Sequence, residues 1–166
     1  MYAVLDLPMQ FRKTLEEERL PLYWQVQAIT SSDEVLPATS GVTAAMAGKG
    51  YLEADMFETV LILTEALINA LKHGNREDPS KQVVLSYHVA TDRVLIEVED
   101  EGPGFDPDSI PDPRLPENVE RTCGRGLFLM RHYSTWLRFN DRGNRVTLCK
   151  ARNARAGQPN GCVSGE

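Results

Sequence analysis

The sequence predicts a single α+β domain in which helices and strands share one core. Three observations support this fold class: an alternating strand pattern near residue 21, a long apolar helical run near residue 60, and two pairs of strand-like segments joined by short turns. The chain has 166 residues, of which 42% are hydrophobic and 25% are charged. This length and composition are enough for one globular domain with a sizeable core.

The first expected elements lie between residues 21 and 50. Residues 21–30 (PLYWQVQAIT) alternate between two sets of side chains, which is typical of a strand. Ser32 or Asp33 can cap a following helix that runs to about Gly48, with Pro37 in its first turns. A turn at residues 48–50 then leads to a second, longer helix.

The remaining elements follow in order. We expect the long helix at roughly residues 53–75, strands at 82–90 and 93–100, a proline- and acid-rich segment at 101–123, a helix at 124–133, and strands at 135–140 and 144–151. Thr91-Asp92 and Asp141-Arg142-Gly143 are short enough to be hairpin turns. We therefore expect one domain at residues 21–152, preceded by an extension at 1–20 and followed by a disordered tail at 153–166.

Composition narrows the function and the location. The net charge of −6 argues against binding to the backbone of DNA or RNA, although a few local groups can still hold a nucleotide. No apolar run reaches the roughly 18 residues of a membrane span, and the N-terminus lacks the order of an export signal. The three cysteines have no metal-ligand spacing and suggest reduced thiols. We therefore expect a cytoplasmic protein that binds neither membrane nor nucleic acid.

The first candidate motif is a polar stripe on the long helix. At about 100° per residue, Glu65, Asn69, Lys72, His73 and Arg76 share one face. Such a stripe can be the solvated side of a helix. Apolar neighbours border it, however, and asparagine is weakly favoured in mid-helix unless its amide has a partner. A carboxylate and a carboxamide one turn apart can activate a hydroxyl and hold a hydrated cation.

The second motif is Asp100-Glu101-Gly102-Pro103-Gly104-Phe105, at the end of a strand. Asp100 continues the side of the strand that carries Val94, Ile96 and Val98, so it should point inward. A buried carboxylate needs a hydrogen-bonding partner, and the exocyclic amine of adenine would be one. Gly102 and Gly104 permit close approach of a ligand to the backbone. An ordinary Gly-Pro-Gly turn is the alternative.

The third motif is Gly124-Arg125-Gly126-Leu127, which opens a helix. Free N–H groups at a helix start can bind phosphate oxygens, and Arg121 or Arg125 could add a charged contact. A flexible hinge is the alternative. The order of the three motifs is much more specific than any one of them.

Together the motifs resemble the GHKL ATPases, which share the Bergerat ATP-binding fold. The small size and the strings TEALINALKHGN, EDEGPGFDP and GRGLFLMRHY are similar to the anti-sigma factor serine kinases of bacterial partner-switching systems. The resemblance covers about residues 20–151. It implies a two-layer α/β sandwich, in which a mixed, mostly antiparallel sheet carries helices on one face and nucleotide lies between the helices and a lid at residues 105–123.

The resemblance also assigns roles to residues. Glu65 would be the general base, or would orient the attacking hydroxyl, and Asn69 would bind Mg²⁺. Asp100 would accept a hydrogen bond from the adenine amino group. The other residues expected at the nucleotide are Lys72, His73, Arg121, Gly124, Arg125, Gly126 and Leu127 near the phosphates, Gly102 and Gly104 at the pocket floor, and Thr147 beside adenine. Thr147 also fits an ordinary strand residue.

The function implied by the resemblance uses ATP and Mg²⁺. The protein would phosphorylate a serine or threonine of a small anti-anti-sigma (STAS-type) protein, and would sequester a sigma factor when that antagonist is phosphorylated. By family analogy alone it could form a homodimer. Two alternatives remain: a nucleotide-gated binding module without catalysis, and the catalytic portion of a histidine kinase. For the latter, none of the three histidines suits a phospho-accepting role.

Overall fold

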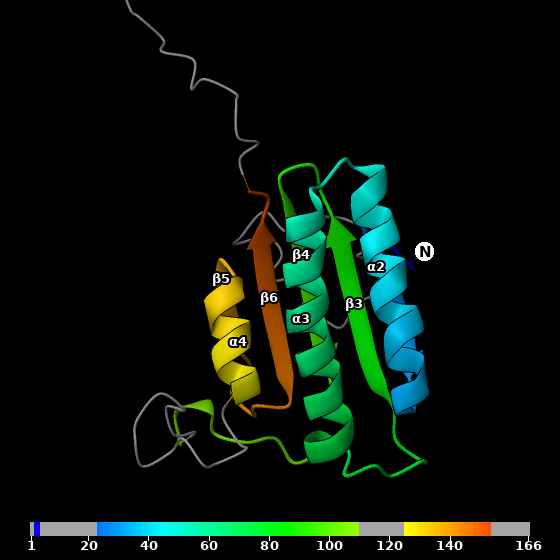
Figure 1. Cartoon of the computed structure of the whole chain (residues 1–166). Coiled ribbons are helices and arrows are strands. Elements are labelled where there is room, and N and C mark those ends of the chain that lie inside the picture. Colours follow the sequence, from blue (N-terminus) through cyan, green and yellow to red (C-terminus); the bar gives the residue numbers. More distant parts are fainter. Residues whose placement is uncertain (1, 4–22, 110–124, 154–166) are drawn as a thin grey trace, which may run out of the picture.

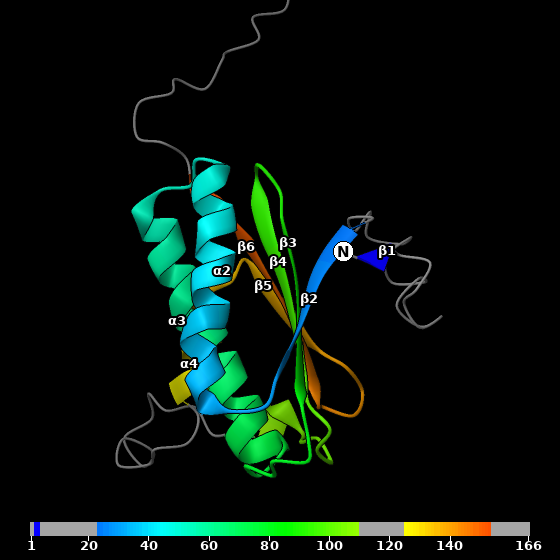
Figure 2. The same cartoon turned by 90° about the vertical axis from the view of Figure 1, so that its right-hand side faces the viewer.

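The computed structural model describes residues 2–3, 23–109 and 125–153. These residues form two layers, a twisted sheet and a set of helices packed against one of its faces (Figure 1). The side view in Figure 2 shows helices α2, α3 and α4 together on one side of the sheet. The expected α+β sandwich with helices on one face is therefore confirmed.

The sheet has the strand order β1-β2-β3-β4-β6-β5. Its strands are β1 (Tyr2–Ala3), β2 (Tyr23–Ile29), β3 (Val83–Val89), β4 (Arg93–Glu99), β5 (Trp136–Phe139) and β6 (Arg145–Ala151). The pairings recorded between these strands are all antiparallel, in line with the mostly antiparallel sheet that we expected. Pairing of β4 with β6 brings the second motif next to the C-terminal hairpin.

The helices begin and end close to the expected residues. They are α2 (Val35–Gly48), entered through a 3₁₀ turn at Ser32–Glu34, α3 (Glu53–Asn69), and α4 (Arg125–Tyr133). A π-helical segment, η3 (Ala70–Gly74), extends α3, and a 3₁₀ turn, η4 (Pro107–Ser109), follows the second motif. No helix in the described part of the chain is long and apolar enough to cross a membrane.

The core lies between the helices and the sheet. Val94, Ile96 and Val98 of β4 are almost fully buried there, and Leu63 and Leu67 of α3 belong to the same cluster. Burying aliphatic side chains of this size stabilises the fold by about 1.5–3 kcal/mol each. Because side chains alternate along a strand, Asp100 leaves β4 on the same side as these residues, as we predicted.

A cluster of charged side chains lies between β6 and the N-terminal end of α3. The Lys150 ammonium lies 2.6 Å from the Glu58 carboxylate and 4.0 Å from Asp55, which is completely buried. Asp55 also accepts a hydrogen bond from the backbone N–H of Asn153 at 3.0 Å. The cluster thus ties β6 to α3 at the end where that helix begins.

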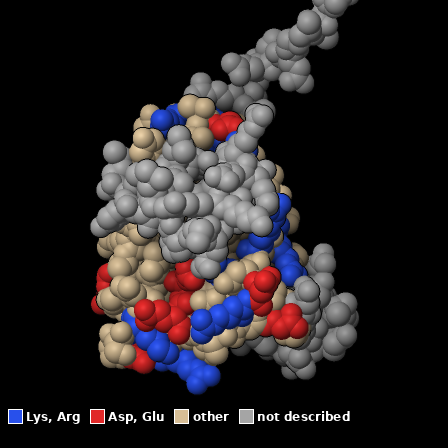
Figure 3. Space-filling model, turned by 180° about the vertical axis from the view of Figure 1, so that it is seen from behind, with Lys and Arg blue, Asp and Glu red and all other residues tan. Residues whose placement is uncertain are grey.

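The other face of the sheet carries a small apolar cluster and charged residues. Trp24, Leu95 and Cys149 are buried there beside Trp136. Where the described residues are visible from behind, acidic and basic side chains lie interspersed rather than in separate patches (Figure 3). Glu97 is on this face, paired with Arg145 at 4.0 Å, and burial raises its pKa to about 7.

Candidate nucleotide-binding site

A cavity of about 370 Å³ opens between the C-terminal part of α3, the end of β4, the start of α4 and the β5–β6 turn. This volume is within the range of small-molecule sites. Residues of all three sequence motifs line it, among them Glu65, Asn69, His73, Asp100, Gly104, Gly126 and Leu127. Residues up to 81 positions apart in the sequence, Glu65 and Val146, therefore meet at one site.

The first and third motifs meet where α4 begins. Gly126, in the first turn of α4, packs so closely on α3 that a β-carbon at this position would overlap the carboxylate of Glu65 and lie 3.2 Å from the amide nitrogen of Asn69. The start of α4 therefore lies directly beside the acid–amide pair. Backbone N–H groups at a helix start, next to a carboxylate and a carboxamide, make an arrangement suited to a phosphate chain and a hydroxyl.

The first and second motifs meet at the π-helical segment. The backbone N–H of Asn75 donates to the carbonyl of Ala70 at 2.8 Å, so the chain after α3 is wound more widely than an α-helix. This winding brings Gly74 against Asp100, where a β-carbon on Gly74 would overlap the carboxylate. Such π-segments within helices are frequent at functional sites.

Asp100 is partly buried, and its carboxylate lines the cavity. One of its oxygens accepts a hydrogen bond from the backbone N–H of Gly102 at 2.8 Å. Burial raises the pKa of this carboxyl, while the Gly102 hydrogen bond and Arg142 act against the rise. A partly desolvated carboxylate facing a cavity gains from a ligand that donates a hydrogen bond, such as an exocyclic amine.

The β5–β6 turn forms the wall beside Asp100. Gly104 and Gly143 both have positive φ angles, +81° and +76°, and a β-carbon on either would overlap the backbone of the opposite turn. The Arg142 guanidinium donates to the carbonyl of Gly102 at 2.7 Å. Two turns far apart in the sequence are thus packed backbone to backbone, which the glycines permit.

Several expected site residues do not line the cavity. Lys72 and Arg125 are exposed and are not among the lining residues. Gly102 does not line the cavity either, but its backbone N–H donates a hydrogen bond to the Asp100 carboxylate. Arg121 and Gly124 lie outside the described residues, as do the tail beyond Asn153 and most of the extension and of the lid.

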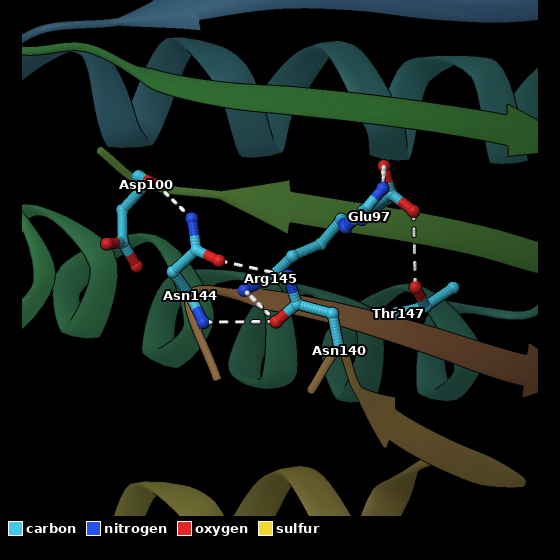
Figure 4. A network of polar contacts seen from close by, with 6 residues as sticks. All are labelled: Glu97, Asp100, Asn140, Asn144, Arg145 and Thr147. Atoms are coloured by element: carbon cyan, nitrogen blue, oxygen red, sulfur yellow. Dashed lines mark hydrogen bonds and ion pairs between the residues drawn. The ribbon is translucent and has the colours of Figure 1, made fainter. Parts of the chain in front are cut away.

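The structure does not place Thr147 at the cavity, where the sequence analysis expected it beside adenine. Its hydroxyl donates to Glu97 at 3.2 Å on the face of the sheet opposite the helices, as Figure 4 shows, so it does not point into the cavity. The neighbouring Val146 lines the cavity instead. Side chains alternate along β6, and its register with β4 decides which set faces the helices.

The structure adds residues that the motifs did not indicate. Phe105 and Phe139 line the cavity and contact each other edge to face, with ring centroids 5.2 Å apart. Asn144, which directly precedes β6, lies opposite Asp100 and also lines the cavity. No local sequence signal marks Asn144, because its place follows from the pairing of β4 with β6.

No group of three or more histidine, cysteine, aspartate or glutamate side chains gathers to hold a metal among the described residues. Asn69 is the side chain that fits a Mg²⁺ role, because its carboxamide lies in the cavity beside Glu65 and the start of α4. Magnesium in nucleotide sites is typically held by one or two protein groups together with substrate phosphates.

Comparison with known proteins agrees with this geometry. Residues 29–150 match the histidine kinase-like ATPase domain family. The chain is also 31% identical over 121 residues to the serine-protein kinase RsbW of Bacillus subtilis (strain 168), covering 69% of this chain and 74% of that protein. For the serine-protein kinase RsbW of Bacillus licheniformis the identity is 30%, with the same coverage. The chain therefore belongs to the GHKL, or histidine kinase-like, ATPase family and to its group of anti-sigma factor kinases.

Proposed function

We propose that this protein is an ATP-dependent serine/threonine protein kinase that phosphorylates an anti-anti-sigma protein and acts as an anti-sigma factor. One observation carries the proposal: the Glu65–Asn69 pair, the start of α4 and Asp100 line the same cavity. The names of the two relatives, both serine-protein kinases, support the choice of reaction.

Each wall of the cavity would contribute one part of the reaction. Asp100 would accept a hydrogen bond from the amino group of adenine, and the start of α4 would bind phosphate oxygens through its N–H groups. Glu65 would orient the serine hydroxyl of the partner and accept its proton as the phosphoryl group is transferred. Phosphoryl transfer depends mainly on such positioning and on charge stabilisation, so the chain needs no covalent intermediate.

Asn69 would hold Mg²⁺, which would supply charge neutralisation at the phosphates. His73, which lines the cavity one turn beyond Asn69, would lie near the same phosphates. Its ring can donate a hydrogen bond from either nitrogen, according to tautomer.

Replacing Glu65 tests the catalytic part of the proposal. Glu65→Gln keeps the shape of the side chain but removes its basicity, so transfer should fall at least about a hundredfold while Mg-ATP still binds. Glu53→Gln, at an exposed position in the first turn of the same helix, is the matched control and should transfer at the original rate. Transfer by the Glu65 variant at the original rate would remove Glu65 from the mechanism. ATP binding by the native protein without any labelled partner would favour a nucleotide-gated binding module.

The partner class can be tested by capture from native lysate with and without Mg-ATP. We expect recovery of a sigma factor or of a small single-domain antagonist, with the balance between them changed by the nucleotide. Recovery of a metabolic enzyme alone would contradict the sigma-factor role and leave the ATP site unaffected.

A further inference from the structure

Asn144 makes two hydrogen bonds with the backbone of Asp100. The N–H of Asp100 donates to the carbonyl oxygen of Asn144 at 2.9 Å, and the carbonyl of Asp100 accepts from the Asn144 amide at 2.6 Å. These two bonds fix the end of β4 from which the carboxylate projects, and Figure 4 shows the one made by the Asn144 side chain. The second of these bonds belongs to the Asn144 side chain, which therefore helps to fix the end of β4 from which the carboxylate projects.

Asn144 is itself fixed by Asn140, across the β5–β6 turn. The Asn144 side chain is 6% exposed, and its carbonyl oxygen accepts from the Asn140 amide at 2.9 Å. The Asn140 carbonyl oxygen in turn accepts from the backbone N–H groups of Asn144 and Arg145, at 3.1 and 3.2 Å. The side-chain oxygen and the side-chain amide group of both asparagines thus have hydrogen-bonding partners. A fully satisfied network of this kind favours a single conformation of the turn.

The β5–β6 turn also contacts the Gly102–Phe105 segment, which follows Asp100 in the chain. Arg142 donates to the carbonyl of Gly102, and the backbone of Phe105 can approach Gly143 closely because glycine has no side chain. Asp100 is therefore held from β6 and from its own following turn. Its carboxylate accepts a hydrogen bond from the backbone N–H of Gly102, and Asp100 lines the cavity.

We propose that Asn144 is a positioning residue for base recognition, acting on the adenine amino group through Asp100. The inference rests on the proposed ATP site and adds a residue to it. The Asn144 side chain makes one of the two contacts with the backbone of Asp100, so its loss would leave the Asp100 carbonyl without this bond and would loosen the end of β4. The carboxylate would then meet the exocyclic amine at a poorer angle, while contacts to the ribose and phosphates would remain.

Two nucleotides separate this role from a merely structural one. ATP carries the exocyclic amine, and purine riboside 5′-triphosphate lacks it but keeps the ring, ribose and phosphates. The native protein should bind ATP about tenfold or more tightly than the analogue, as expected for one hydrogen bond to a charged acceptor. In Asn144→Ala this ratio should fall towards one, with affinity for the analogue nearly unchanged. The control Asn153→Ala, at an exposed site beyond the other end of β6, should keep the native ratio.

The outcomes are distinguishable by calorimetry with Mg²⁺ present. A native protein that binds neither nucleotide would refute the proposed function. A native preference for ATP that persists in Asn144→Ala, even with both affinities lowered together, would overturn the inference alone. If thermal unfolding shows that Asn144→Ala is not folded, Asn140→Ala tests the inference instead. This variant removes the hydrogen bonds from Asn140 to Asn144 and leaves Asn144 itself in place. An ATP preference at the native ratio in that variant would overturn the inference, and a reduced ratio would support it.

Discussion

The carboxylate of Glu65 lies directly against the α-carbon of Gly126, although the two residues are 61 positions apart in the sequence. This contact joins the C-terminal part of α3 to the first turn of α4. It places the proposed base beside the proposed phosphate-binding turn, and it leaves no room for a side chain between them. The contact gives a direct way to disturb the chemistry without disturbing the core.

Gly126→Ala should reduce phosphoryl transfer at least about tenfold, because the new β-carbon forces the Glu65 carboxylate out of its place. The displaced group is the end of a flexible side chain, so the free energy of unfolding should change by less than about 1 kcal/mol. Transfer rates to the unphosphorylated partner protein check the first expectation, and denaturant unfolding checks the second. Gly48→Ala, with no atom within 4 Å of the new β-carbon, is the control. Equal rates for the two variants would show that the Gly126 contact is irrelevant to catalysis.

Gly74→Ala should weaken ATP binding about tenfold or more, since its β-carbon would overlap the carboxylate of Asp100. The backbone of Asp100 is tied to β6, so the carboxylate has little freedom to move aside. Titration calorimetry measures the effect. Gly41→Ala meets only the Tyr87 hydroxyl, at 3.7 Å, and should bind ATP as the native protein does. Native affinity in the Gly74 variant would argue against Asp100 as a ligand-binding group.

Lys150→Met should lower the free energy of unfolding by about 3 kcal/mol or more, because it leaves Asp55 and Glu58 without their cation in a buried place. Arg93→Met is the matched control. Arg93 pairs with Asp92 at 3.8 Å on the surface, with both side chains largely exposed, so its loss should cost less than about 1 kcal/mol. Urea unfolding compares them. Similar losses in the two variants would mean that burial does not strengthen the Lys150 cluster.

Glu97 should make stability fall as the pH rises. Its pKa is about 7 in the folded chain, chiefly because of burial, and 4.5 is its ordinary value. Between these values the unfolded chain releases the proton first, so ionisation favours unfolding. From pH 5 to pH 8 the native protein should lose about 2 kcal/mol more than Glu97→Gln, whose amide does not titrate. Parallel stability curves for the two proteins would contradict the raised pKa.

Features with a local period could be predicted from the sequence. The period of 3.6 residues placed Glu65 and Asn69 on one helix face, and the period of two placed Asp100 on the core side of β4. The structure confirms that all three line one cavity. Such patterns need only one element at a time, which is why they could be interpreted without knowing the fold.

Features that depend on strand register could not be predicted in the same way. In β6 the alternate sets are Val146, Leu148 and Lys150 against Arg145, Thr147 and Cys149, and neither set is clearly the apolar one. Pairing with β4 settles the choice, so the expectation for Thr147 was wrong. The same register brings Asn144 opposite Asp100, and Lys150 is buried because α3 supplies its acidic partners.

Titration of the protein with ATP in the presence of Mg²⁺ shows whether the cavity is a nucleotide site and whether Asp100 belongs to it. We predict one site per chain in the native protein, at least about tenfold weaker binding in Asp100→Asn, and native binding in the control Asp92→Asn, whose side chain is exposed. Absence of binding heat with the native protein over a range of temperatures, or native affinity in Asp100→Asn, would contradict this assignment.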